Sequence, residues 1–453
     1  MRKIVLLCVV AFALGGCGLY TKYQRPMVDD VVNRLYTPTN PGDSTSIASL
    51  DWEDLFTDER LQVLINTGLR NNLDLNVARL KVAEAEAVLQ TSKLAYIPSV
   101  NFEVDGSVSN TNFQNTSTGY SAGFSTGWEI DIFGRLTNAK RGAQAALVAS
   151  EAYRQAVQTQ LVATIADSYY TLLMLDEQLA ISRRTLDYWE ENIRTLEALK
   201  RAGKTNESAV LQAKANRLSV EGSVLTMMRQ IAQQQNSLCA LLGITPQQIR
   251  RGELAEQTFP EVLYVGIPAQ LLSRRPDVRQ AEMNLAQAFY NTNAARAEFY
   301  PKVTLGGTAG WTSSGVAITN PGGWLLSAVG GLVQPVFTKG QNKARLKIAQ
   351  ARQEQALLQF RQSLLDAGTE VNNALIQWQT AKERLEIDKK QIVHLRAAVW
   401  NTRLLMKHGL TNYLEVLTAQ QNLLQAELTE ISDKYAEIQG IVHLYHALGG
   451  GVK

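Results

Sequence analysis

Apolar residues recur at every seventh position in two long stretches of the chain. In the first stretch they are Ile165, Leu172, Leu179, Leu186 and Ile193. In the second they are Leu357, Leu364, Val371, Trp378, Leu385, Ile392, Val399 and Met406. Proline, which breaks helices, is absent from 99–245 and after Pro335. The sustained seven-residue period therefore predicts long helices that pack as left-handed coiled coils.

Two glycines interrupt these helical patterns at equivalent places. Gly203 and Gly409 are each followed two residues later by a Thr-Asn pair, and the heptads then resume. Because glycine commonly ends a helix and Thr or Asn commonly begins the next, we expect two helical hairpins with tips near 203 and 409. The arm from about 136 to 200 would be a rod on the order of 100 Å long at the helical rise per residue.

Segments of a different composition, rich in Gly, Ser, Thr and aromatic residues, lie between the predicted helices. Phe102, Val104 and Val108 alternate with polar residues, and Phe124 and Trp128 do the same. This period of two predicts β-hairpins at about 99–130 and 302–335, and strands of near ten residues with polar loops are typical of outer-membrane strands. Two ordinary hairpins that cap a helical bundle are the alternative.

The two halves of the chain repeat one another. At an offset of 203, Asn72-Leu73-Asp74-Leu75 aligns with Arg275-Pro276-Asp277-Val278. At an offset of 206, Gly203-Lys204-Thr205-Asn206 aligns with Gly409-Leu410-Thr411-Asn412. Such a repeat indicates a pseudo-symmetric object rather than an enzyme with one cleft. We divide the chain into a leader at 17–56, repeats at 57–243 and 263–449 with a connector at 244–262, and a tail at 450–453. The first helices of the two repeats are expected at roughly 57–95 and 270–298.

Four strands per chain are too few to form a closed membrane structure. Unpaired backbone groups at an open sheet edge each cost several kcal/mol in hydrocarbon, and known closed membrane barrels begin at eight strands. Several copies must therefore share strands, and three is the smallest number that leaves a hollow product. We predict a mainly helical homotrimer with a membrane β-barrel of 12 strands, continuous with a long periplasmic barrel of coiled-coil helices.

The beginning of the chain has the features of a secretory leader. Arg2 and Lys3 precede an apolar run that ends in Leu14-Gly15-Gly16-Cys17. This pattern predicts a signal peptide at 1–16 with a lipobox, and a mature chain whose Cys17 carries a diacylglycerol and an N-acyl chain. An uncleaved anchor with an incidental cysteine is the alternative, although the run is too short to span a bilayer. Gly18 after the cysteine favours delivery to the outer membrane.

The remaining composition excludes several classes of function. The full chain has 45 Lys and Arg against 42 Asp and Glu, and loss of the leader reduces the net charge to +1, so no nucleic acid partner is implied. No phosphate-binding loop, nucleophile elbow or dinucleotide fingerprint is present, and His443 and His446 lack further ligands for a metal set. We therefore expect no enzyme activity, no metal and no cofactor beyond the lipid. Cys239 is left without a disulfide partner.

Several local motifs resemble those of a known family along essentially the whole chain. They are Tyr23-Gln24-Arg25-Pro26 after Cys17, Asp51-Trp52, Asn71-Asn72-Leu73-Asp74-Leu75, Asp131-Ile132-Phe133-Gly134-Arg135 and Leu271-Leu272-Ser273-Arg274-Arg275-Pro276-Asp277-Val278-Arg279. These residues resemble the TolC-like outer-membrane efflux proteins, and most closely the lipid-anchored NodT-type channels of tripartite pumps. The resemblance implies the same trimeric double barrel, and helical tips that dock on a periplasmic adaptor bound to an inner-membrane transporter, here expected to be of the RND type.

The resemblance also implies two sets of functional residues. The adaptor-facing tips would comprise Arg201, Gly203, Lys204, Thr205, Lys407, Gly409, Thr411 and Asn412. Family members often close the inner end with acidic and aromatic rings, but here no Asp or Glu lies between 389 and 414. The departure argues against an acidic gate, and we take Arg396, Trp400 and Arg403 as candidates for an arginine-based periplasmic constriction.

The leading expectation is a passive exit duct for small molecules in the outer membrane. It would be lipid-anchored, extend into the periplasm and use energy supplied by the partner transporter. The exit duct of a type I protein secretion system is the alternative within the same fold. A non-conducting lipoprotein spacer, an adhesin and a lipid-linked hydrolase are the other classes considered. The transported substrates are not predictable from the sequence.

Overall fold

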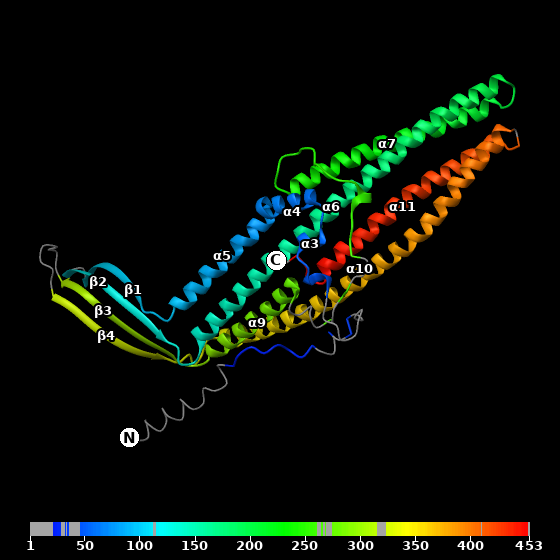
Figure 1. The fold of residues 1–453 in the computed structure, drawn as a ribbon. Helices are drawn as coiled ribbons and strands as arrows, with labels where there is room; N and C mark the ends of the chain where they lie inside the picture. The colour runs from blue at the N-terminus through cyan, green and yellow to red at the C-terminus, as the bar shows by residue number, and fades with distance from the viewer. Residues whose placement is uncertain are drawn as a thin grey trace. The chain divides into compact units, whose positions relative to one another are not determined.

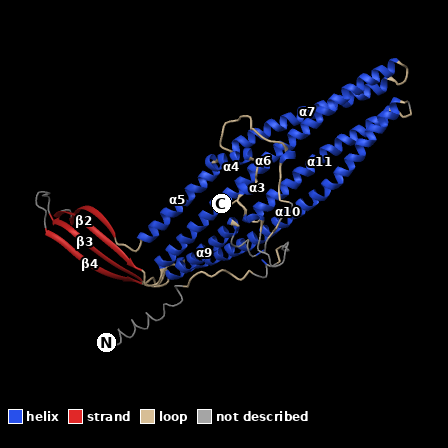
Figure 2. Ribbon diagram, in the orientation of Figure 1, coloured by secondary structure: helices blue, strands red, loops and turns tan. Residues whose placement is uncertain are grey.

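The computed structural model describes residues 21–28, 32, 34–35, 46–111, 115–260, 264–265, 268, 274–314, 323–408 and 410–451. Within them the chain is mainly helical, with its strands gathered in one sheet (Figure 2). It divides into two units, which we describe separately. Unit 1 comprises 1–27, 80–152 and 279–362, and unit 2 comprises 28–79, 153–278 and 363–453.

The sheet belongs to unit 1 and contains four antiparallel strands in the order β1-β2-β3-β4. The strands are β1 (Ser99–Thr111), β2 (Asn115–Ile130), β3 (Lys302–Ser314) and β4 (Gly323–Val333). The β2–β3 register, with Gly123 opposite Gly310, joins the hairpins of the two repeats directly. Among the described residues β1 and β4 each pair with a single strand, so both edges of the sheet are open.

Unit 2 is built around two helical hairpins, which Figure 1 shows with both tips at the same end of the unit. The first hairpin joins α6 to α7 and the second joins α10 to α11. The helices are α6 (Arg135–Arg201), α7 (Glu207–Leu241), α10 (Gln341–Lys407) and α11 (Tyr413–Ala447), of which α6 and α10 begin in unit 1. Apart from Leu357, the two seven-residue apolar series lie in unit 2, where Ile165, Leu172, Val371 and Ile392 are buried.

Shorter helices complete the two units. They are η2 (Ile47–Ser49), α3 (Trp52–Leu55), α4 (Glu59–Asn71), α5 (Leu73–Leu94), η3 (Leu254–Glu256) and α9 (Pro276–Ala297). Asp58 begins α4 by accepting a hydrogen bond from the Arg60 N–H at 2.8 Å. In unit 2, Phe56 packs edge-on against Tyr445, with 6.1 Å between ring centroids, and so holds the leader segment against α11.

The internal repeat predicted from the sequence is present in the structure. Both α5 and α9 have 22 residues, β1 and β3 have 13, α6 and α10 have 67, and α7 and α11 have 35. Gly243 and Gly449, which end α7 and α11, have φ values of 68° and 85°. Gly243 lies against the backbone of Asn71, and Gly449 lies against the backbone of Arg274. A Cβ on either glycine would come within 2.7–2.8 Å of those backbone atoms.

Candidate functional site

One face of the sheet is apolar and exposed on the single chain. The register places Phe102 opposite Phe124 and Trp311 opposite Trp324, with ring centroids 5.2 Å and 4.9 Å apart. The exposed members of this face, which we call the apolar sheet face, are Val100, Phe102, Val104, Val108, Phe124, Trp128, Leu305, Trp324, Leu326 and Leu332. Leu326 is 84% exposed. Large apolar surfaces of this kind mark contact with lipid or another molecule.

The opposite face is polar on β1 and β2. Glu103 and Asp105 project from it, and Ser125 donates a hydrogen bond to Glu103 at 2.9 Å. Gly123 and Gly310 lie on this face, and a Cβ on Gly310 would come within 2.4 Å of Ala122 O and Gly123 Cα. The two strands therefore approach closely where side chains are absent.

The tips of the hairpins have matching backbone structures. At the first tip Gly203 has a φ of 70°, and the Gly203 and Lys204 N–H groups donate to Lys200 O and Leu199 O, both at 2.9 Å. This is the two-bond arrangement by which a left-handed glycine ends a helix. Asn206 then begins α7 by accepting a bond from the Ala209 N–H at 3.0 Å.

The second tip repeats these features in its described part. The Leu410 N–H donates to Leu405 O at 2.9 Å, and Asn412 begins α11 by accepting a bond from the Glu415 N–H at 3.3 Å. Gly409, which we predicted to belong to this tip, lies outside the described residues.

The remaining predicted tip residues are mostly accessible. Arg201, Gly203, Lys204, Lys407 and Asn412 are exposed, and Thr205 and Thr411 are half-buried. Glu207 forms an ion pair with Lys200 across the first tip, and Glu197 pairs with Lys214 at 2.8 Å further along the same hairpin. The described tips therefore present several cations beside an exposed leucine, Leu410.

The two hairpins contact one another close to their tips. Trp189 and Leu196 of α6 pack with Val210 and Ala213 of α7 and with Tyr413 and Leu417 of α11. Asn192 of α6 donates to Gln420 Oε1 of α11 at 2.8 Å. These contacts tie the end of the first hairpin to the end of the second.

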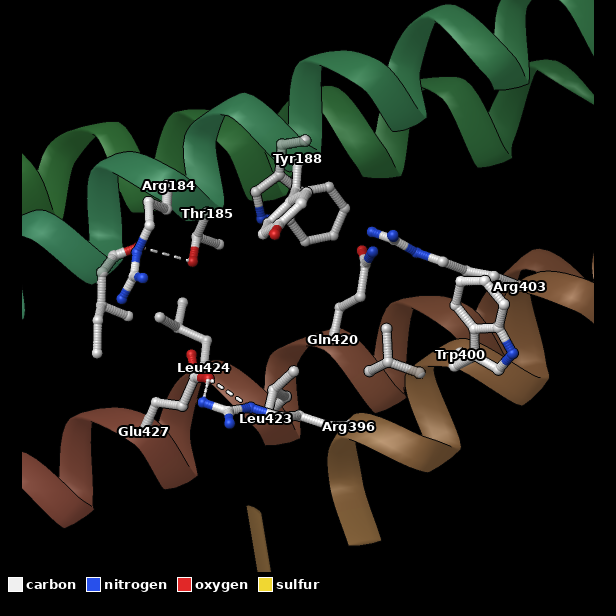
Figure 3. A pocket seen from close by; sticks show the side chains of 13 residues that line it. Arg184, Thr185, Tyr188, Arg396, Trp400, Arg403, Gln420, Leu423, Leu424 and Glu427 are labelled. Carbon is white, nitrogen blue, oxygen red and sulfur yellow. Dashed lines mark hydrogen bonds and ion pairs between the residues drawn. The ribbon is translucent and has the colours of Figure 1, made fainter. Parts of the chain in front are cut away.

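The three candidate gate residues line one hollow of about 340 Å³ between α6, α10 and α11. Figure 3 shows Arg403 and Gln420 directed toward Tyr188, with Trp400 beside Arg403. The Arg403 guanidinium lies over the Tyr188 ring, 5.4 Å from its centroid. Trp400 is 70% exposed.

The environment of Arg396 differs from that suggested by the sequence. Its Nη2 forms an ion pair with Glu427 Oε1 of α11 at 2.9 Å. The stretch 389–414 contains no acid, but the antiparallel partner helix supplies one. The positive charge of Arg396 is therefore compensated within the chain, whereas Arg403 contacts an aromatic ring.

The two repeats also build equivalent junctions where α5 and α9 begin. Asn72 accepts a bond from the Leu75 N–H at 2.9 Å and donates to Leu241 O at 2.8 Å. Arg275, at the equivalent position, donates to Ala447 O at 2.9 Å. It also pairs with Asp277 at 2.5 Å and Glu370 at 2.7 Å. Burial acts to lower the pKa of Arg275, but these two carboxylates more than offset it and the net pKa is raised.

Histidines do not form a metal site in the described part of the chain, where no cluster of three candidate ligands occurs. His443 Nε2 lies 3.0 Å from Asp167 Oδ2, and this hydrogen bond raises the pKa of His443. Burial, with the charge of Arg275, lowers the pKa of His446. Cys239 is buried, and its thiol points to Gln247 O at 3.5 Å.

Two predicted features at the start of the chain are not covered. The signal peptide at 1–16 and the lipidation residue Cys17 lie outside the described residues. None of the helices in the described residues is long and apolar enough to cross a bilayer.

Comparison with known proteins adds to this geometry. The model of the outer membrane efflux protein family matches residues 64–244 and 267–450, one match for each repeat. The chain belongs to the outer membrane efflux protein family. It is 31% identical to the cation efflux system protein CusC of Escherichia coli (strain K12), over 99% of this chain and 99% of CusC.

Solved structures of outer-membrane channels are similar to this chain over nearly its whole length. The outer-membrane channel OprN superposes with a TM-score of 0.86 at 27% identity, covering 95% of this chain and 99% of OprN. The open state of the Neisseria gonorrhoeae MtrE outer membrane channel superposes with a TM-score of 0.84 at 28% identity, covering 96% of this chain and 98% of MtrE.

The predicted family and fold class are thereby confirmed. The chain is an outer-membrane channel component of an efflux system, and the members of its family are channels rather than enzymes. Sequence reasoning placed the hairpin tips through Gly203 and Gly409. It missed Tyr188, Gln420 and Glu427 as neighbours of the candidate gate residues.

Proposed function

We propose that three copies of this chain form a passive exit duct across the outer membrane, made of a 12-stranded barrel continued by a barrel of helices in the periplasm. The observation that carries the proposal is the sheet: four strands, two open edges and one apolar face. In a bilayer the open edges must be paired, because no water is available to satisfy their backbone groups. Pairing β4 of one copy with β1 of the next satisfies both edges.

The difference between the two faces of the sheet supports the same assembly. The polar face carries Glu103 and Asp105 and has glycines at the closest strand approach, so it suits the inside of a hollow barrel. The apolar sheet face then meets lipid. Small or polar side chains predominate on the inner face of β1, β2 and β3, and the large aromatic side chains lie on the outer face, which allows the sheet to close with a water-filled bore.

The proposed partners are a periplasmic adaptor and an inner-membrane transporter, which we expect to be of the RND type. The exposed cations Arg201, Lys204 and Lys407 at the tips suit an adaptor that presents carboxylates. The chain has no nucleotide-binding motif, so the transporter would supply the energy for export. Relatives named as efflux proteins favour small-molecule efflux over type I protein secretion.

The adaptor contact is tested by charge reversal. Replacing Arg201, Lys204 and Lys407 together with Glu should reduce co-purification of the adaptor at least tenfold, because the tips become like-charged with it. Lys347→Glu, an exposed cation of α10 in unit 1 far from the tips in sequence, is the matched control and should have no effect. Retention of the adaptor by the triple variant would overturn the assignment of the tips.

The candidate gate is tested separately. Arg396→Ala and Arg403→Ala should each raise single-channel conductance if these side chains narrow the bore. Glu427→Gln releases Arg396 from its ion pair and should change conductance in the same experiment. Unchanged conductance in both arginine variants would show that they do not form the constriction.

We further propose that Cys17 carries the lipid anchor, with diacylglycerol on its thiol and an acyl chain such as palmitate on its amino group. The support is the lipobox at Leu14-Gly15-Gly16-Cys17. A Salmonella typhimurium relative, 30% identical, is named a probable outer membrane lipoprotein. Mass spectrometry of the mature N-terminal peptide tests the assignment.

A further inference from the structure

The hollow between α6, α10 and α11 contains hydrogen-bond donors without acceptors. Arg403 Nε and Gln420 Nε2 are shielded from solvent, and neither has a partner among the described residues. The other end of the Gln420 amide is occupied, because its Oε1 accepts the bond from Asn192. A buried donor that lacks an acceptor is destabilising, so the two together favour an acceptor placed between them.

The charge around the hollow is positive. Arg184, Arg396 and Arg403 line it, and Glu427 is its single lining acid. Glu427 is already paired with Arg396, and the Arg403 guanidinium contacts the Tyr188 ring. An incoming acceptor that carries a negative charge would therefore be bound more strongly than a neutral one.

The rest of the wall is apolar and aromatic. Trp189, Leu423 and Leu424 also line the hollow, and Tyr188 and Trp400 add two further aromatic rings. A volume of about 340 Å³ lies at the lower end of the range of small-molecule sites. A free inorganic anion would leave these walls uncovered, and a cation would face the guanidinium groups.

We propose that this hollow is a binding site for a small aromatic anion, a planar carboxylate or sulfonate with about two fused rings. Its charged group accepts from Arg403 Nε and Gln420 Nε2, and its rings lie between Trp400, Tyr188 and the leucines. Such a ligand touches α6, α10 and α11 at once and so links the ends of the two hairpins. The proposal rests on the geometry of unit 2 alone and does not depend on the trimeric duct.

The site is tested by isothermal titration calorimetry on the full-length protein in an uncharged maltoside detergent. The probe is 2-naphthoate, and its uncharged analogue 2-naphthamide is the control ligand. We expect one naphthoate per chain, and at least tenfold weaker binding of naphthamide, since hydrogen bonds to a charged acceptor are stronger than those to a neutral one. Absence of saturable naphthoate binding, or equal affinity for the two ligands, would overturn the proposal.

Variants locate the ligand. Arg403→Leu should weaken naphthoate binding about 10–100-fold, and Gln420→Leu should weaken it several-fold. Trp400→Ala changes an exposed side chain and should also weaken naphthoate binding. This variant supplies the test if Arg403→Leu fails to fold. Arg194→Leu removes an exposed arginine of α6 that does not line the hollow and should leave affinity unchanged. Equal affinity in wild type and in both Arg403→Leu and Trp400→Ala would place the ligand elsewhere.

Discussion

Replacing Arg275 with Met is expected to destabilise unit 2 without altering the sheet. Arg275 is 3% exposed and makes four hydrogen bonds, to both oxygens of Asp277, to Glu370 and to Ala447 O. These bonds connect the beginning of α9 to α10 and to the end of α11. Methionine fills a similar volume but supplies no donor, so a carbonyl and two carboxylates lose their partner.

The size of the effect follows from the exposure of those partners. Breaking a fully buried ion pair costs about 3–5 kcal/mol. The Asp277 and Glu370 side chains are 42% and 49% exposed, so water replaces part of what each loses. We therefore expect a loss of about 2–4 kcal/mol per chain. With an unfolding entropy of about 2.1 cal/mol/K per residue, this corresponds to about 2–4 °C in Tm.

The assay is thermal melting of the helical circular dichroism signal of the purified protein in detergent. Arg275→Lys keeps the charge but loses the planar fork, and its Tm should lie between those of wild type and Arg275→Met. Asn72→Ala at the equivalent junction of the first repeat loses a neutral cap and one bond, about 1–2 kcal/mol, and should lower Tm less. A Tm for Arg275→Met within 1 °C of wild type would refute the reasoning.

Three further predictions concern the sheet, a titrating pair and the lipid. Gly310→Val should abolish folded trimer on unheated gels, because the new Cβ would lie 2.4 Å from Ala122 O. Gly106→Val should assemble normally, because no atom lies within 4 Å of its Cβ. Similar yields of trimer from the two variants would contradict the close approach of the strands at Gly310. The raised pKa of His443 means that its pairing with Asp167 stabilises the fold fully below about pH 6.5 and is lost as pH rises through the folded value. The excess Tm of wild type over His443→Gln should therefore shrink from pH 5.5 to pH 8.5, and a gap that widens would show the opposite sign. Cys17→Ala should remove the lipid mass from the mature protein, and an unchanged N-terminal mass would contradict the predicted anchor.

The sequence contained most of the information on the helices and the repeat. The long proline-free heptads of the first repeat predicted a helical arm at about 136–200, and the structure has α6 at Arg135–Arg201. Gly203 indicated the first tip because a left-handed residue at the end of a helix favours glycine. The β-hairpins were visible because an exposed sheet with one apolar face has a strict period of two.

Contacts between helices were harder to predict, since they depend on which residues of a hairpin face one another. Residues at similar distances on either side of a tip meet, as Arg217 and Glu190 do in the first hairpin and Arg384 and Asp433 do in the second. Searching one arm alone for acids therefore overlooked Glu427 opposite Arg396. Two contacts join the different hairpins, one between Tyr188 and Arg403 and one between Asn192 and Gln420. The residue pattern of a single helix predicts neither contact.

Reconstitution of the purified full-length protein into planar bilayers tests the central claim most directly, with the particle mass measured on the same sample. We predict a single species of three mature chains plus bound lipid that produces discrete steps of ion current. Each mature chain should be lighter than the 50.0 kDa full chain by the mass of residues 1–16. A monodisperse single chain in detergent, or a trimer that carries no current under any applied voltage, would contradict the account.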